Sequence, residues 1–270
     1  MNLVSVIIPT FNRESTLKRA ITSVLAQTYQ NLECIVVDDF SSDDTKELVL
    51  SIGDDRVKYT RNEENYGVSY SRNIGFKKSS GEFIALLDSD DEWLKDKLER
   101  QVPLLSDFPL VHGEEIWIRN GKKVNQKNIH KKSGGQIFER CLELCLIAPS
   151  ASIMRRSLYS DMQGFREDFP VCEDYELWLR ITSQYEVGFI SAPTINKYGG
   201  HADQLSLKYK AMDYWRILAM DKLRESGNLS DDQKKSLEEV MLRKCEILKK
   251  GYEKHNNVTH LPYIKELLGE

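Results

Sequence analysis

The first hundred residues alternate between short apolar runs and amphipathic segments. Apolar runs at residues 4–8, 32–37, 57–60 and 83–87 have the length and composition of strands that are buried on both faces. From residue 15 onward, Leu17, Ala20, Ile21 and Val24 follow the spacing of one buried helix face. Further helices are expected after residues 44 and 67. This strand–helix alternation predicts an α/β fold with a mostly parallel sheet flanked by helices.

After residue 94 the pattern becomes less regular. We expect helices at residues 94–105, at 137–146 and from 173 onward, and strands at 110–112, 116–118, 152–154, 187–191 and 194–198. Residues 119–135 are basic and loop-like, and they form either a functional loop or a solvated connection. From about residue 207 the chain is helical and highly charged. We therefore expect a domain at residues 1–206 and a helical extension at residues 207–270.

Polar side chains stand where three of the predicted strands end. Thr10 follows the first strand, Asp39 the second, and Asp88 and Asp90 the fourth. Parallel strands place their carboxyl ends along one edge of a sheet, where α/β proteins bind ligands. Two carboxylates this close repel each other unless a cation lies nearby, and Mg²⁺ or Mn²⁺ bound to a diphosphate suits them. The alternative is that these acidic residues only form a turn or cap a helix.

Composition narrows the classes of partner. The 270 residues are 40% hydrophobic and 30% charged, and the formal net charge of −4 argues against a nucleic-acid-binding surface. No apolar run approaches the roughly 20 residues of a membrane-spanning helix, and the N-terminus does not have the pattern of a signal peptide. Five cysteines without metal-ligand spacing indicate reduced thiols. We expect a cytoplasmic protein.

Five motifs, taken in order, give the chain a family resemblance. They are Val4-Ser5-Val6-Ile7-Ile8-Pro9-Thr10-Phe11-Asn12, Val36-Val37-Asp38-Asp39-Phe40-Ser41-Ser42-Asp43, Asn65-Tyr66-Gly67-Val68-Ser69 with Ser71-Arg72-Asn73, Leu87-Asp88-Ser89-Asp90-Asp91, and Glu173-Asp174-Tyr175-Glu176-Leu177-Trp178-Leu179-Arg180. The chain thereby resembles a family 2 glycosyltransferase with the GT-A fold, of the bacterial type that builds surface glycans. The resemblance covers roughly residues 3–205 and leaves the C-terminal helices outside. Phe40 departs from it, because the family usually has a small residue there, and we expect this change to reshape the edge of the nucleotide pocket.

The resemblance implies roles for particular residues. The nucleotide-binding residues would be Pro9, Thr10, Phe11, Asn12, Asp39, Asn65, Arg72, Asp88 and Ser89. The Asp39 carboxylate would accept a hydrogen bond from a uracil N–H, and Asp90 would be a ligand of Mn²⁺ or Mg²⁺. His201 matches a less regular position near the metal and diphosphate, and its alternative is an exposed turn residue. Asp174 would be the general base, although a carboxylate at a helix start also favourably meets the helix dipole.

The implied activity is that of an inverting, metal-dependent glycosyltransferase of the hexosyltransferase type. It would move a sugar from a nucleotide-diphosphate sugar, with UDP favoured through Asp39, to a glycan, a lipid-linked sugar or a protein in surface polysaccharide biosynthesis. The C-terminal helices would dock at the inner face of the membrane or form a homodimer.

Three rival functions have weaker support. A phosphoryl-transfer hydrolase carries its D-x-D after the first strand, and a nucleotidyltransferase needs a glycine-rich loop there. A non-catalytic sugar-nucleotide or glycan-binding protein would not need both Asp90 and Asp174.

Overall fold

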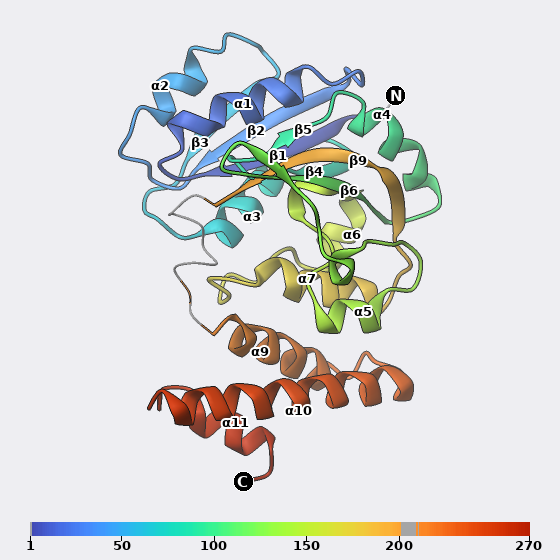
Figure 1. Cartoon of the computed structure of the whole chain (residues 1–270). Helices are drawn as coiled ribbons and strands as arrows, with labels where there is room; N and C mark the ends of the chain where they lie inside the picture. Colours follow the sequence, from blue (N-terminus) through green and yellow to red (C-terminus); the bar gives the residue numbers. More distant parts are fainter. Residues whose placement is uncertain (1, 201–208, 210) are drawn as a thin grey trace.

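One nine-stranded sheet forms the centre of the molecule (Figure 1). The computed structural model describes residues 2–200, 209 and 211–270. The strands run in the order β3-β2-β1-β4-β8-β6-β9-β5, with β7 paired to β6. Their bounds are β1 Val4–Thr10, β2 Leu32–Asp38, β3 Val57–Arg61, β4 Phe83–Leu86, β5 Glu92–Trp93, β6 Leu110–Arg119, β7 Lys122–Val124, β8 Ser152–Arg155 and β9 Gly188–Gly199.

The N-terminal half of the sheet is parallel, as the alternating pattern predicts. β1 pairs in parallel with β2 on one side and with β4 on the other, so Thr10 lies beside Asp38 and Ile7 beside Leu86. Every residue of β1, β2 and β4 is buried. The predicted α/β fold is therefore confirmed, and the ends of these three strands meet at one edge.

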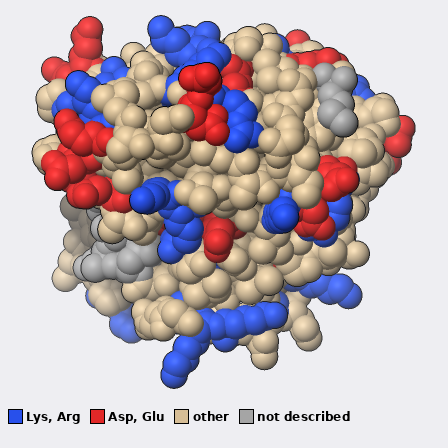
Figure 2. Space-filling view, turned by 90° about the horizontal axis from the view of Figure 1, so that it is seen from above, with Lys and Arg blue, Asp and Glu red and all other residues tan. Residues whose placement is uncertain are grey.

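Helices cover both faces of this half. α1 (Glu14–Leu25) and α2 (Thr45–Leu50) lie above the sheet in Figure 1, whereas α3 (Val68–Lys78), α6 (Arg156–Asp161) and α7 (Glu173–Thr182) lie below it. α3 approaches β1 closely, since a Cβ on Gly75 would lie 2.4 Å from the Ile7 side chain. Seen from above, basic and acidic side chains are intermixed across the surface (Figure 2).

The second half differs from the sequence pattern in several places. β6 and β9 are single long strands, where the sequence indicated two short strands each. Register shifts at Glu114 absorb the interruption near Pro193, so parallel pairing continues on both sides of it. The basic segment 119–135 contains β7 and a 3₁₀ turn, Asn128–His130. The expected 94–105 helix is split into α4 (Lys97–Gln101) and a 3₁₀ turn, Val102–Ser106, and α5 spans only Phe138–Glu143. β5, α6 and a third 3₁₀ turn, Pro149–Ala151, were not predicted.

The C-terminal helices form further layers beneath α5 and α7 (Figure 1). They are α9 (Met212–Glu225), α10 (Asp231–Lys254) and α11 (Leu261–Leu267). Ser230 and Gln233 form a capping box at the start of α10. Ile217 and Met241 join the same hydrophobic cluster as Leu177, so these helices complete the core on that side. Of the helices that the structure describes, none combines the length and apolar character that crossing a membrane requires.

Candidate active site

Asp39 organises the edge where β1 and β2 end. Its carboxylate accepts hydrogen bonds from Asn62 Nδ2 (2.7 Å), Tyr66 N (3.0 Å) and Gly67 N (2.7 Å). Its own backbone N–H donates to Thr10 O at 2.8 Å. A carboxylate has about four acceptor positions, so roughly one stays open for a donor on a ligand. Asp39 therefore fixes the loop that leads into α3 and can still accept one further hydrogen bond.

Two exposed aromatic residues flank Asp39. Phe11 follows β1 and is 45% exposed, and Phe40 follows β2 and is 47% exposed. Phe40 has a φ of 71°, which is strained for a bulky L-residue. The Arg61 guanidinium lies 5.0 Å from the centre of the Phe40 ring and donates to Ser41 O at 2.8 Å. The surrounding structure thus holds a large apolar side chain out into solvent in an unfavourable backbone conformation.

The other expected nucleotide residues lie around these two aromatics. Asn12 (φ 52°) accepts a hydrogen bond from Ser42 N at 2.8 Å. The Asn65 side chain donates to Asp39 O at 3.2 Å. The Thr10 hydroxyl is buried and has no hydrogen-bond partner among the described residues. Pro9 is buried within β1 beside Val37.

Arg72 joins two parts of the site that lie far apart in the sequence. Its guanidinium donates to Asp88 Oδ1 at 2.8 Å and to Glu173 Oε1 at 2.7 Å, and the residue is only 2% exposed. Burial alone would lower the pKa of Arg72, but the carboxylates of Asp88 and Glu173 raise it. Burial and the neighbouring Asp174 raise the pKa of Glu173 to about 7. The end of β4 and the start of α7 are therefore linked through one buried cation.

Three consecutive positions after Asp88 have different surroundings. Ser89 is buried. Asp90 has a side chain that is 20% exposed, at 3.9 Å from Arg13 Nη2. Asp91 is 2% exposed and accepts from Ser150 Oγ (2.6 Å) and Tyr198 N (2.9 Å). Burial, together with Asp90 and Asp88, raises the pKa of Asp91 well above its usual value. Asp91 thus anchors β9, whereas the Asp90 side chain stays partly exposed beside Arg13.

The carboxylates present fit a hard divalent cation. Asp88 and Asp90 have side chains that are 31% and 20% exposed, and Mg²⁺ or Mn²⁺ needs only one or two protein carboxylates when a diphosphate and water supply the rest. His201 lies outside the described residues. Within residues 2–200, 209 and 211–270, no three His, Cys, Asp or Glu side chains converge as a preformed metal cage.

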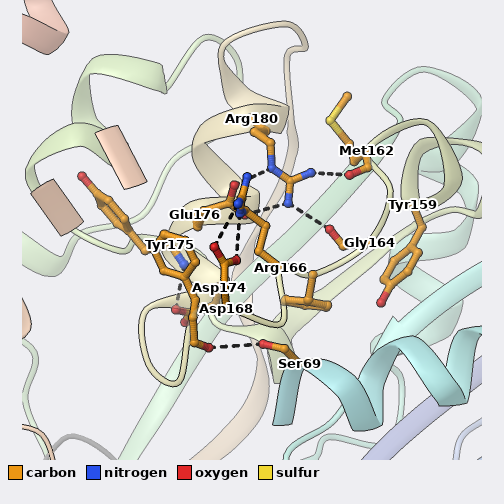
Figure 3. A network of polar contacts seen from close by, with 12 residues as sticks. Ser69, Tyr159, Met162, Gly164, Arg166, Asp168, Asp174, Tyr175, Glu176 and Arg180 are labelled. Atoms are coloured by element: carbon orange, nitrogen blue, oxygen red, sulfur yellow. Dashed lines mark hydrogen bonds and ion pairs between the residues drawn. The ribbon is translucent and has the colours of Figure 1, made fainter. Parts of the chain in front are cut away.

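Asp174 lies in the first turn of α7 and is half-buried. Its Oδ1 accepts from Tyr175 N at 2.7 Å, and its Oδ2 accepts from the Cys145 thiol at 3.4 Å. Figure 3 shows the support of this helix: Arg180 pairs with Glu176 at 2.6 Å and donates to the carbonyl of Gly164. The turn that precedes α7 is thereby bound to the helix, which fixes the position of Asp174.

A small cavity of about 100 Å³ opens beside Asp174. Its lining residues are Glu115, Trp117, His130, Lys132, Leu144, Cys145, Leu146, Ile147, Ala148, Asp174 and Lys197. Sequence reasoning assigned no contacts in this region and did not identify Glu173, Cys145 or Lys197 as site residues. Glu173 lies beside Asp174 in the last of the five family motifs. Cys145 and Lys197 lie in none of these motifs, so no sequence signal marked them.

Comparisons with known proteins establish the class of protein. The profile of the family described as "Glycosyl transferase family 2" matches residues 5–162. The chain belongs to this family and is a glycosyltransferase. The predicted family and enzyme class are thus confirmed.

Particular relatives are more informative about chemistry. The chain is 37% identical over 221 residues to the Escherichia coli UDP-Glc:alpha-D-GlcNAc-diphosphoundecaprenol beta-1,3-glucosyltransferase WfgD, covering 80% of this chain and 85% of the relative. It is 32% identical over 192 residues to WfaP, an E. coli enzyme of the same description, covering 68% and 72%. The solved structure of S. aureus TarS 1-349 in complex with UDP-GlcNAc has a TM-score of 0.78 at 21% identity, covering all of this chain and 80% of that one. This last likeness shows a shared GT-A fold.

Proposed function

We propose that this protein transfers a sugar from a UDP-sugar, with inversion, to a hydroxyl of a lipid-linked sugar during surface polysaccharide biosynthesis. The observation that carries the proposal is the buried Arg72 bridge, which holds Asp88 of the donor side and the helix bearing Asp174 in one fixed arrangement. The names of the E. coli relatives support UDP-glucose as donor and a diphosphoundecaprenol-linked acceptor. We propose that an enzyme acting on such an acceptor docks at the inner face of the membrane.

Different residues bind the nucleotide, hold the cation and accept the proton. The loop around Asp39, with Phe11 and Phe40, holds the nucleotide, and Asp39 accepts from the uracil N–H. Asp88 and Asp90 would hold a divalent cation, which when bound would offset the charge that develops on the leaving diphosphate. Asp174 takes the proton of the acceptor hydroxyl as that oxygen attacks the anomeric carbon from the face opposite the diphosphate. A single displacement of this kind inverts the anomeric configuration.

Nucleotide titration tests the donor half of the proposal. We expect calorimetry to show that UDP binds more tightly with Mn²⁺ than without it, and more tightly than GDP or dTDP. Asp90→Ala removes a partly exposed carboxylate of the cation site, so it should abolish the Mn²⁺-dependent gain in UDP affinity. Asp107→Ala, an exposed carboxylate in a different turn, is the matched control and should bind as wild type does. UDP affinity that does not depend on Mn²⁺ in the wild type would refute the metal role.

Phe40 gives a second test of the nucleotide pocket. Stacking of a base on an aromatic ring contributes about 1–3 kcal/mol, so Phe40→Gly should weaken UDP binding by about 5- to 150-fold. Glycine adopts a positive φ without strain, and this gain offsets the lost contact with Arg61. The free energy of unfolding should therefore change by no more than about 1 kcal/mol.

Urea denaturation and calorimetry measure the two quantities separately. Tyr185→Ala removes another exposed aromatic side chain and should leave UDP affinity unchanged. A Phe40→Gly protein that binds UDP normally would show that the ring does not contact the nucleotide.

A further inference from the structure

The cavity beside Asp174 is built from the C-terminal half of the sheet and the segments over it. β6 and β9 supply one side, where Lys197 pairs with Trp117 in register. The other sides come from residues 130–132, from residues 144–148 and from Asp174. All lining residues lie at or after position 115, whereas the proposed donor residues before position 91 do not line it. Its contents should therefore belong to the acceptor and not to the nucleotide.

Two of the charged side chains in the cavity already satisfy each other. Lys132 Nζ lies 2.6 Å from Glu115 Oε1 and donates to Leu146 O at 2.6 Å. The indole of Trp117 donates to Glu115 Oε2 at 2.7 Å. Both side chains of the ion pair are almost fully buried, at 5% and 1% exposed. This pair is structural, and it fastens the 119–135 segment onto the sheet.

Besides Asp174, the charged lining residue that remains is Lys197. The backbone of Lys197 pairs with Trp117 in the sheet, but its ammonium group makes no hydrogen bond or ion pair with any residue in the part of the chain that the structure describes. Burial alone would lower the pKa of Lys197, but Glu115, Asp91, Asp88 and Asp174 together raise it, so the ammonium group is charged. A charged amine that faces a cavity without a direct partner is suited to bind an anion.

The proposed reaction supplies an anion at this place. Asp174 must contact the acceptor hydroxyl, so the acceptor sugar has to lie in or over the cavity. In a sugar linked to a lipid through diphosphate, the first phosphate is bonded to that same sugar ring. We propose that Lys197 binds the phosphate attached to the acceptor sugar and selects acceptors that carry it. This inference rests on the proposed function, because it assumes that Asp174 meets an acceptor hydroxyl.

The test compares two acceptors that differ only in this phosphate. One is N-acetylglucosamine α-linked through diphosphate to an undecyl chain, and the other is undecyl α-N-acetylglucosaminide, which is uncharged. Calorimetry on UDP-loaded protein measures the affinity for each acceptor and does not depend on which sugar the donor carries. Initial rates of transfer from UDP-glucose give the KM for UDP-glucose and the KM for the acceptor. Lys197→Met removes the charge but keeps much of the stem, and Lys197→Arg keeps the charge. Lys123→Met, an exposed lysine of β7, is the matched control.

A hydrogen bond between charged groups contributes about 1.5–3 kcal/mol. We therefore expect Lys197→Met to weaken binding of the diphosphate acceptor by about 10- to 100-fold, with KM for UDP-glucose unchanged. For the neutral acceptor, wild type and Lys197→Met should bind equally. Lys197→Arg should recover most of the affinity, and Lys123→Met should behave as wild type.

Three outcomes would overturn the inference. A rise in KM for UDP-glucose with unchanged acceptor affinity would assign Lys197 to the donor diphosphate. Equal losses with both acceptors, together with a lower unfolding midpoint, would make it a structural residue. If wild type bound the two acceptors with equal affinity, the protein would not recognise the phosphate. If the wild type binds UDP but neither acceptor, the proposed function fails as well.

Discussion

Asp174→Asn should lower kcat for sugar transfer by about 10²- to 10⁴-fold while UDP affinity stays at the wild-type value. The amide cannot take the proton of the acceptor hydroxyl. Its oxygen can still accept from Tyr175 N, the 2.7 Å bond that the carboxylate accepts now, so the start of α7 should keep its structure. Initial rates with UDP-glucose and the diphosphate-linked acceptor, together with UDP calorimetry, measure the two effects.

The control for this substitution is Asp168→Asn. Asp168 is a nearby carboxylate whose side chain is 51% exposed and pairs with Arg166 on the surface (Figure 3). It should transfer sugar at the wild-type rate. If Asp174→Asn also kept near-normal turnover, the general base would have to be a different residue, and the assignment of the acceptor cavity would fall with it.

Arg72→Met should lower the free energy of unfolding by about 3–5 kcal/mol. Removing one partner of a buried ion pair leaves uncompensated charge, and here Asp88 and Glu173 both lose their cation. Arg166→Met breaks an ion pair of similar length, 2.9 Å, but at the surface, so it should cost less than about 1 kcal/mol. Urea denaturation of both variants gives the comparison. Similar costs for the two would mean that the buried bridge contributes little to stability.

The pH dependence of this cost follows from Glu173. Its pKa is raised from 4.5 to about 7 in the folded protein. The stabilisation linked to Glu173 is therefore fully present below pH 4.5 and is lost as the pH rises through about 7. Arg72 opposes this loss because it pairs with the ionised carboxylate. The destabilisation by Arg72→Met should thus be larger at pH 8 than at pH 6, and a cost that falls with rising pH would contradict the bridge.

The pattern of apolar runs was sufficient to predict the parallel half of the sheet. The apolar runs that end at Thr10, Asp38 and Leu86 are buried on both faces, and strands of this kind pair in parallel with helices between them. Residues that follow such strands must then share an edge, which is why Thr10, Asp39, Asp88 and Asp90 could be grouped in advance. The second half was less predictable, because β6 and β9 continue through a polar interruption that only their mutual pairing tolerates.

The sequence by itself determined the family, the α/β architecture and the identity of most candidate residues, since these depend on local pattern and on motif order. The tertiary structure added that Asp90 and Asp91, which are adjacent and chemically identical, differ in exposure. It also showed that Arg72 contacts Glu173, which is 101 residues away in the sequence, and that Lys197 and Asp174 line the same cavity. Burial and contacts between distant segments determine whether a side chain is charged and which of its hydrogen-bonding positions stay open. The spacing of residues along the chain does not encode these contacts.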